Sequence, residues 1–149
     1  MVAADGPRVM EFNCRFGDPE TQAMLPRLDS DLVDIMMAVV DGRLNDVKIR
    51  WRDEACVGVI LASGGYPGKY ATGLPIAGLD AVDDDVMVFH AGTKFKDDEI
   101  CTDGGRVLTV TALGRNIAEA RDKVYRNISR IGFNGCHYRR DIALREVAG

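Results

Sequence analysis

The chain has 149 residues, the size of one domain or of two small lobes, and 46% of them are hydrophobic, so a buried core is possible. Its formal net charge of −4 argues against the basic surface that broad, non-specific nucleic-acid binding requires. No apolar run is long enough to cross a membrane, and no charged-then-apolar leader opens the chain. The four cysteines are scattered and form no CxxC pair. They favour reduced thiols in a cytoplasmic protein over disulfides or a zinc site.

Residues 8–16 alternate between apolar and polar side chains, which is the period of a strand with one face in a core. Glu11, Asn13 and Arg15 share the polar face of this predicted strand. A strand without a partner in its own segment is not stable alone. We therefore expect it to pair either with the later sheet or with sequence outside this chain.

Two helices are predicted after this strand. Asp18 is a good N-cap and Pro19 fits the first helical position, so a short helix should run to Leu25. Ser30 should cap a second helix that stops at Gly42. The apolar residues at helical spacing predict the buried side of this second helix: Leu32, Ile35, Met36, Val39 and Val40.

After residue 43 the chain changes to short apolar runs that are typical of a β unit. The run at 55–63 is apolar enough to be a strand buried on both faces. A loop rich in Gly and Pro follows at 64–78 and must bend repeatedly. Three further strands are predicted, with charged or Gly-rich turns between the last two, at 47–51, 86–95 and 106–114.

A final helix is predicted from Asn116, which forms a capping-box-like pair with Glu119. An apolar stripe at helical spacing extends to Ile131, and Gly132 should close the helix. We therefore expect an α+β chain in two parts. Residues 1–43 are one strand followed by helices, and residues 44–149 are a mainly antiparallel β unit closed by a C-terminal helix.

The stretch EFNCRFGDP has the most chemical content. Glu11 and Asn13 would stand side by side on one strand face, and their carboxylate and amide oxygens are hard ligands that suit Mg²⁺. Arg15 could hold a phosphate or a carboxylate through two parallel bonds, and Gly17 lets backbone approach a ligand closely. A half-buried strand also shows polar residues on its wet face for solubility alone, so both interpretations stay open on spacing.

The longer stretch EFNCRFGDPETQ resembles the signature of the phosphoribosylamine–glycine ligase family, within the ATP-grasp superfamily. The segments GGYPGKY, FHAGTK, GGRVLTVTALG and YRRDI resemble the same family in order and spacing, so the resemblance covers essentially the whole chain. It implies an ATP-dependent ligase that joins 5-phosphoribosylamine to glycine through a glycyl phosphate, in de novo purine synthesis.

The resemblance also implies roles for single residues. Glu11 and Asn13 match the pair that holds Mg²⁺ (or Mn²⁺) against the ATP phosphates. Arg15 matches the catalytic position that stabilises the transferring phosphoryl group or a bound carboxylate. Gly17, Asp18 and Pro19 match the loop that lines the same ATP- and substrate-binding site.

Members of that family are much longer, with most of their length upstream of the matching point. Residues 1–43 would then be the end of an ATP-grasp lobe, and residues 44–149 a C-terminal domain like the closing domain of biotin carboxylase, which is barrel-sandwich-like (rudiment single-hybrid-like). The expected partners are ATP, glycine, 5-phosphoribosylamine and the missing N-terminal lobes, with neither nucleic acid nor membrane. The isolated chain is expected to be inactive.

Two alternatives are kept. Another ATP-grasp ligase or carboxylase subunit would share the Glu-x-Asn pair but should lack RFGDPE and FHAGT. A non-catalytic binding or scaffolding module would keep the fold without the activity. Retention of Glu11, Asn13 and Arg15 counts against this alternative, and the absence of the upstream lobes counts for it. His90, Lys69 and Lys94 are predicted to have structural or surface roles.

Overall fold

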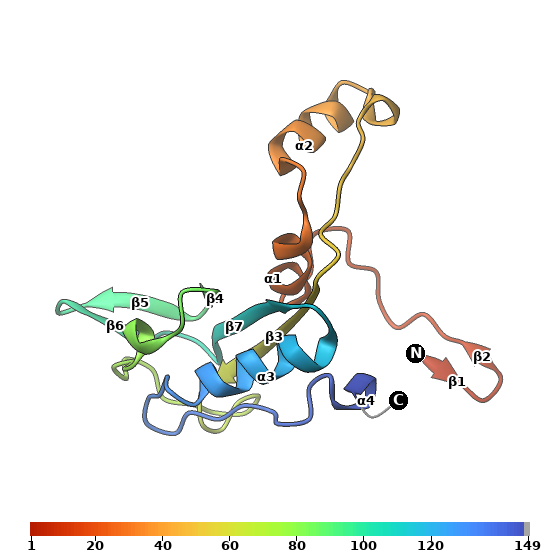
Figure 1. Ribbon diagram of the computed structural model, residues 1–149. Helices are drawn as coiled ribbons and strands as arrows, with labels where there is room; N and C mark the ends of the chain where they lie inside the picture. Colours follow the sequence, from red (N-terminus) through yellow and green to blue (C-terminus); the bar gives the residue numbers. More distant parts are fainter. Residues whose placement is uncertain (148–149) are drawn as a thin grey trace.

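A three-stranded antiparallel sheet with the order β3–β7–β4 forms the centre of the computed structural model, which describes residues 1–147 (Figure 1). Strand β7 lies in the middle and pairs along both of its edges. Its alternate residues Leu108, Val110 and Ala112 are fully buried. The sheet strands are β3 (Ala55–Ala62), β4 (Val86–His90) and β7 (Arg106–Gly114).

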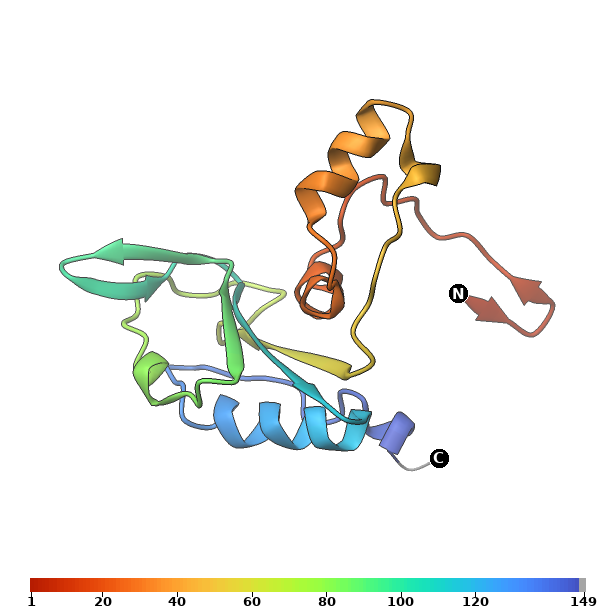
Figure 2. The ribbon, with the colours of Figure 1, turned by 45° about the horizontal axis from the view of Figure 1, so that its top comes forward.

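Helix α3, Ile117–Ile128, covers one face of this sheet (Figure 2). The Asn116 side chain accepts a hydrogen bond from the Glu119 N–H at 2.9 Å, so the predicted cap is confirmed. Ala120, Val124 and Ile128 are fully buried against the sheet, which confirms the predicted stripe. The helix ends at Ile128, before the predicted stop at Gly132.

Helix α1, Glu20–Met24, lies on the opposite face of the sheet, where Gly58 of β3 permits a close approach. A Cβ atom at Gly58 would lie 3.1 Å from Thr111 Oγ1 and 3.9 Å from Ala23 Cβ. Strand β3 is therefore fully buried towards α3 and partly buried towards α1. The predicted burial on both faces is confirmed in part.

A second, two-stranded sheet projects beside β4 (Figure 1). It consists of β5 (Thr93–Lys96) and β6 (Glu99–Thr102), joined by a turn in which Asp97 and Asp98 have positive φ angles of 50° and 63°. The single strand predicted at 86–95 is broken at Gly92, whose backbone lies too close to Gly104 for a side chain. Strand β6 is absent from the sequence prediction because only two of its four residues are apolar.

Residues 8–16 do not form the predicted strand. A small hairpin of β1 (Val2–Ala3) and β2 (Gly6–Pro7) precedes them, and no strand of the described residues 1–147 pairs with them. The Phe12 side chain is 84% exposed. The prediction is wrong for this chain because extended backbone needs a neighbouring strand to satisfy its hydrogen bonds, and the later sheet does not supply one.

Helix α2, Leu32–Val40, and the segment that follows it form an arm that stands away from the sheet (Figures 1 and 2). Asp31 caps α2 by accepting a hydrogen bond from the Val33 N–H at 2.7 Å, so the predicted cap at Ser30 is wrong. Ser30 Oγ instead accepts from the Arg50 N–H at 2.8 Å across the base of the arm. The helix stops at Gly42, which has the expected positive φ of 69°.

The predicted buried side of α2 is confirmed only in part: Leu32 and Ile35 are partly buried, but the other three residues of the stripe are exposed. Val39 and Val40 are 56% and 79% exposed, whereas Ala38 is the buried residue of the helix. The predicted strand at 47–51 is reduced to one bridge between Trp51 and Leu28. The remaining short helices are η1 (Leu25–Arg27), η2 (Leu44–Asp46), η3 (Leu79–Ala81) and α4 (Leu144–Val147).

No helix within residues 1–147 is long and apolar enough to cross a membrane.

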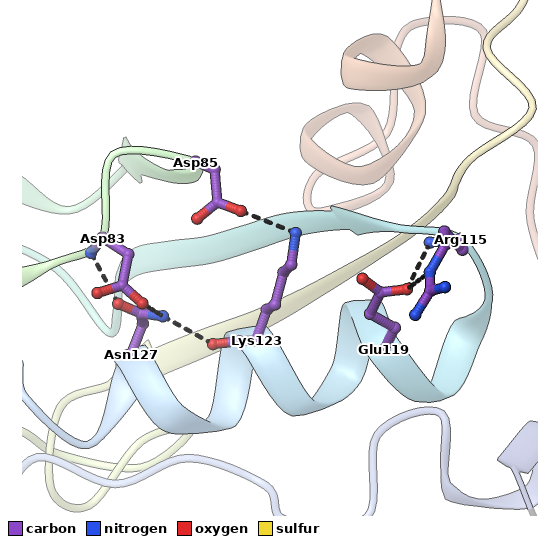
Figure 3. Close-up of polar contacts among 6 residues, drawn as sticks. All are labelled: Asp83, Asp85, Arg115, Glu119, Lys123 and Asn127. Carbon is purple, nitrogen blue, oxygen red and sulfur yellow. Dashed lines mark hydrogen bonds and ion pairs between the residues drawn. The ribbon is translucent and has the colours of Figure 1, made fainter.

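The loop at 64–78 bends as expected, with positive φ angles at Gly65, Gly73 and Gly78. After η3 the chain reaches Asp83, which joins a polar network with α3 (Figure 3). There the fully buried Asn127 of α3 donates to Asp83 Oδ2 at 3.0 Å and accepts from the Asp83 N–H at 2.8 Å.

Hydrogen bonds from Arg130 and Asn127 lower the pKa of Asp83 below its usual value. Because the folded pKa lies below the unfolded one, this contact stabilises the fold above the unfolded pKa and is lost as the pH falls through the folded pKa.

We expect Gly78→Ala to destabilise the fold by about 3 kcal/mol, because φ is +81° there and a Cβ would collide with the Arg130 carbonyl oxygen. Gly73→Ala is the matched control: φ is +76°, but nothing lies within 4 Å of its Cβ, so a loss of about 1 kcal/mol is expected. Urea unfolding of the chain measures both. Equal losses would contradict the packing argument.

We expect Asn127→Ala to cost about 2–3 kcal/mol in unfolding free energy, because it leaves the Asp83 N–H in a part-buried site without its partner. Ser129→Ala, at the exposed C-cap of α3, removes an exposed bond to the Arg126 carbonyl and should change stability by less than about 0.5 kcal/mol. Thermal unfolding of the two variants makes the comparison. A loss at Asn127 no larger than that at Ser129 would show that the network is not stabilising.

Candidate functional site

Five of the six residues predicted for the site line one open surface depression of about 470 Å³. The sixth, Pro19, lines a neighbouring and more apolar cavity of about 350 Å³. The depression thus gathers residues from 11–18 even though they form no strand. Its predicted lining residues are Glu11, Asn13, Arg15, Gly17 and Asp18, and Glu20 and Met24 of α1 complete it together with Phe16.

Glu11 and Asn13 lie side by side, as their spacing predicts. Asn13 Nδ2 donates a hydrogen bond to Glu11 Oε1 at 3.0 Å, and both residues are exposed. Turning the Asn13 amide over would present its oxygen beside the carboxylate instead. Two hard oxygen ligands are what a protein contributes when substrate phosphates supply the rest of the shell of a Mg²⁺ ion. Within residues 1–147 no group of three or more His, Cys, Asp or Glu could hold a metal.

Arg15 is exposed at the same depression. Its Nη1 donates to the Phe16 carbonyl at 2.8 Å, which fixes one edge of the guanidinium against the backbone. A guanidinium has five N–H donors, so most of its hydrogen-bonding capacity is available to an anion.

Gly17 and Asp18 form one wall of the depression, and Pro19 leads from them into α1. The Thr21 N–H donates to the Gly17 carbonyl at 3.0 Å, and the Thr21 hydroxyl donates to the same oxygen. Pro19 occupies the N-cap position of α1, and Asp18 makes no capping bond, so the predicted cap is wrong. Asp18 is instead turned towards the sheet.

Arg106, at the start of β7, forms an ion pair with Asp18. Its Nη2 donates to Asp18 Oδ2 at 3.0 Å, and its Nη1 donates to the Asp18 carbonyl at 2.8 Å. The two residues are 88 positions apart, and no local pattern in the sequence joins them. Sequence reasoning therefore missed this residue beside the site.

Other residues considered from the sequence lie in ordinary contacts. His90 Nδ1 is 3.1 Å from Thr93 Oγ1, and Lys94 Nζ forms an ion pair with Asp103 at 2.8 Å. All four cysteines are free thiols. Burial raises the pKa of Cys56 to about 11, so this thiol stays protonated at neutral pH and is not activated as a nucleophile.

Comparisons with known proteins agree on one family. Residues 56–145 match the family model described as phosphoribosylglycinamide synthetase, C domain. The chain is 51% identical to the phosphoribosylamine–glycine ligase of Caldanaerobacter subterraneus subsp. tengcongensis, over 96% of the chain and 34% of that protein. It is 52% identical to the enzyme of the same name from Allochromatium vinosum, over 99% of the chain and 35% of that protein.

A solved structure is also similar. The crystal structure of phosphoribosylamine–glycine ligase from Thermotoga maritima matches with a TM-score of 0.74 and 32% identity, over 96% of this chain and 35% of that one. The chain therefore spans about a third of the length of the relatives it matches. Because the family model covers more than half of its residues, the chain belongs to the family of the phosphoribosylglycinamide synthetase C domain.

Proposed function

We propose that this chain supplies the C-terminal part of an ATP-dependent phosphoribosylamine–glycine ligase. That enzyme joins 5-phosphoribosylamine and glycine to give glycinamide ribonucleotide, by way of a glycyl phosphate. The observation that carries the proposal is the depression at residues 11–18, where a carboxylate, an amide and a guanidinium lie together. The relatives that match nearly the whole chain carry the name phosphoribosylamine–glycine ligase, and this supports the proposal.

Glu11 and Asn13 would hold Mg²⁺ (or Mn²⁺) in this depression, and their adjacency and hard oxygen atoms fit that role. The ion would supply charge neutralisation for the ATP phosphates. The open shape of the depression suits a site that other parts of a longer enzyme complete.

Arg15 is the residue we assign to charge stabilisation. Its free N–H groups can hold the phosphoryl group during transfer, or the glycine carboxylate before it. The loop of Gly17, Asp18 and Pro19 would line the same ATP- and substrate-binding site and orient what binds there. Such chemistry depends mainly on positioning and on charge neutralisation.

The exposed apolar residues support a division of the chain into two parts. We propose that residues 1–43 end an ATP-grasp lobe and that residues 44–149 form a C-terminal domain of the barrel-sandwich type. Phe12, Val39 and Val40 are more than half exposed, and they would be covered by the rest of the lobe. The isolated chain should then lack turnover.

The proposal predicts activity in a chimera in which this chain replaces the matching third of the Caldanaerobacter ligase. With phosphoribosylamine present, the chimera should release phosphate from ATP in a glycine-dependent reaction. Glu11→Gln should lower kcat/KM by about 10²-fold or more and raise the Mg²⁺ concentration needed for half-maximal rate, because a charged ligand is lost. Phosphate release at varied Mg²⁺ measures both effects.

Glu99→Gln is the control, since Glu99 is an exposed carboxylate on β6, outside the residues that line the depression. Its rate and Mg²⁺ dependence should equal those of the unsubstituted chimera. A folded chimera without glycine-dependent phosphate release would overturn the proposed ligase function. An active chimera whose Glu11→Gln variant behaves like the Glu99→Gln variant would overturn the metal role of Glu11.

A further inference from the structure

A single side chain of the sheet reaches across to the loop that walls the depression. Arg106 donates to both the carboxylate and the backbone carbonyl of Asp18, at 3.0 Å and 2.8 Å. The guanidinium therefore holds both the Asp18 side chain and the Asp18 peptide group, and Gln22 Nε2 donates to the other carboxylate oxygen at 3.3 Å. A surface ion pair between two flexible side chains would fix neither.

The direction of Arg106 depends on an irregularity in the sheet. Leu61 of β3 is opposite Leu108 of β7, but the next residue, Ala62, is opposite Arg106, so β7 carries one extra residue there. Strict alternation would put Arg106 on the same face as Leu108, which is buried in the core under α3. The bulge instead turns Arg106 to the face on which α1 lies. Bulges commonly re-aim a side chain next to a functional site.

The Arg106–Asp18 contact is accompanied by packing of α1 on the sheet. Ala23 of α1 lies over Gly58 of β3. The side chains of Arg106 and Asp18 are 38% and 45% exposed, so their ion pair contributes little to stability. The main effect of this ion pair is therefore to fix the position of the loop, and its contribution to the free energy of unfolding is small.

We propose that Arg106 is a positioning residue, which holds the loop of Gly17, Asp18 and Pro19 in the place where the ATP–metal complex needs it. This inference rests on the proposed ligase function. Arg106 would act through Asp18, so its loss should lower kcat while the KM for ATP changes less. A misplacement of about 1 Å in such a site costs on the order of 10²-fold in rate. Lysine should not replace it, because an ammonium cannot bond to both oxygens with the geometry of a guanidinium.

The test uses the same chimera with Arg106→Ala, Arg106→Lys, Asp18→Asn and the double variant Arg106→Ala/Asp18→Asn. The expected result is a kcat lowered about 10- to 100-fold in each, a change in KM for ATP of less than about 3-fold, and a double variant no worse than the worse single one. Lys94→Ala is the control, because its ion pair with Asp103 is similarly exposed but lies on the β5–β6 hairpin. Its kcat should be unchanged. Values of kcat for the two Arg106 variants within 2-fold of the unsubstituted chimera would overturn the proposal.

A second measurement separates this inference from the proposed function. In the 149-residue chain, Arg106→Ala should speed amide hydrogen exchange at Thr21, whose N–H in α1 bonds to the loop carbonyl of Gly17, and leave the exchange of β7 unchanged. Unchanged exchange at Thr21 would overturn the positioning role even in an inactive chimera. Faster exchange together with an inactive unsubstituted chimera would support the positioning of the loop and reject the ligase function.

Discussion

Strand β7 is the element on which the rest of the structure depends. It pairs with β3 on one edge and with β4 on the other, and its side chains are buried on both faces. Helix α3 packs on one face of the sheet and α1 approaches the other. The nine residues of β7 therefore position both helices. A backbone that is hydrogen-bonded along both edges cannot shift without breaking both ladders, and such a strand gives its neighbours a rigid reference.

The elements with complete local signals could be predicted from the sequence. Strand β7 has the predicted bounds, and α3 begins at the predicted cap, because propensity, capping and apolar period all agree there. The strand at 8–16 and most of the buried side of α2 could not be predicted from the sequence. The strand pattern has no partner within the described residues, and the stripe of α2 is covered only at Leu32 and Ile35. An apolar stripe on a helix predicts that this face is buried, but it does not indicate which part of the protein buries it.

The site residues divide in the same way. The closeness of Glu11 and Asn13 follows from their spacing in the sequence. Two residues that are two positions apart in an extended segment remain close whether or not a strand forms. Arg106 could not be predicted, because its direction results from a bulge in the pairing of β3 with β7. Alternation along the sequence would have assigned its side chain to the core face. Long-range register is therefore the information that the sequence pattern lacks at this site.

The contrast between the sheet and the depression follows from what each is built on. In the sheet, neighbouring strands satisfy each other's backbone hydrogen bonds. Glu11, Asn13 and Arg15 instead lie on a segment without such strand pairing, and their side chains contact only each other or near neighbours in sequence. Catalytic geometry requires groups that are held within a fraction of an ångström, and this segment alone has too few constraints to provide that. The loop at Asp18 is the place where the depression is tied to the rigid sheet, through Arg106. Under the proposed ligase function, precision at the site comes from that contact and from the parts of the longer enzyme that would cover the exposed apolar residues of 8–16 and α2.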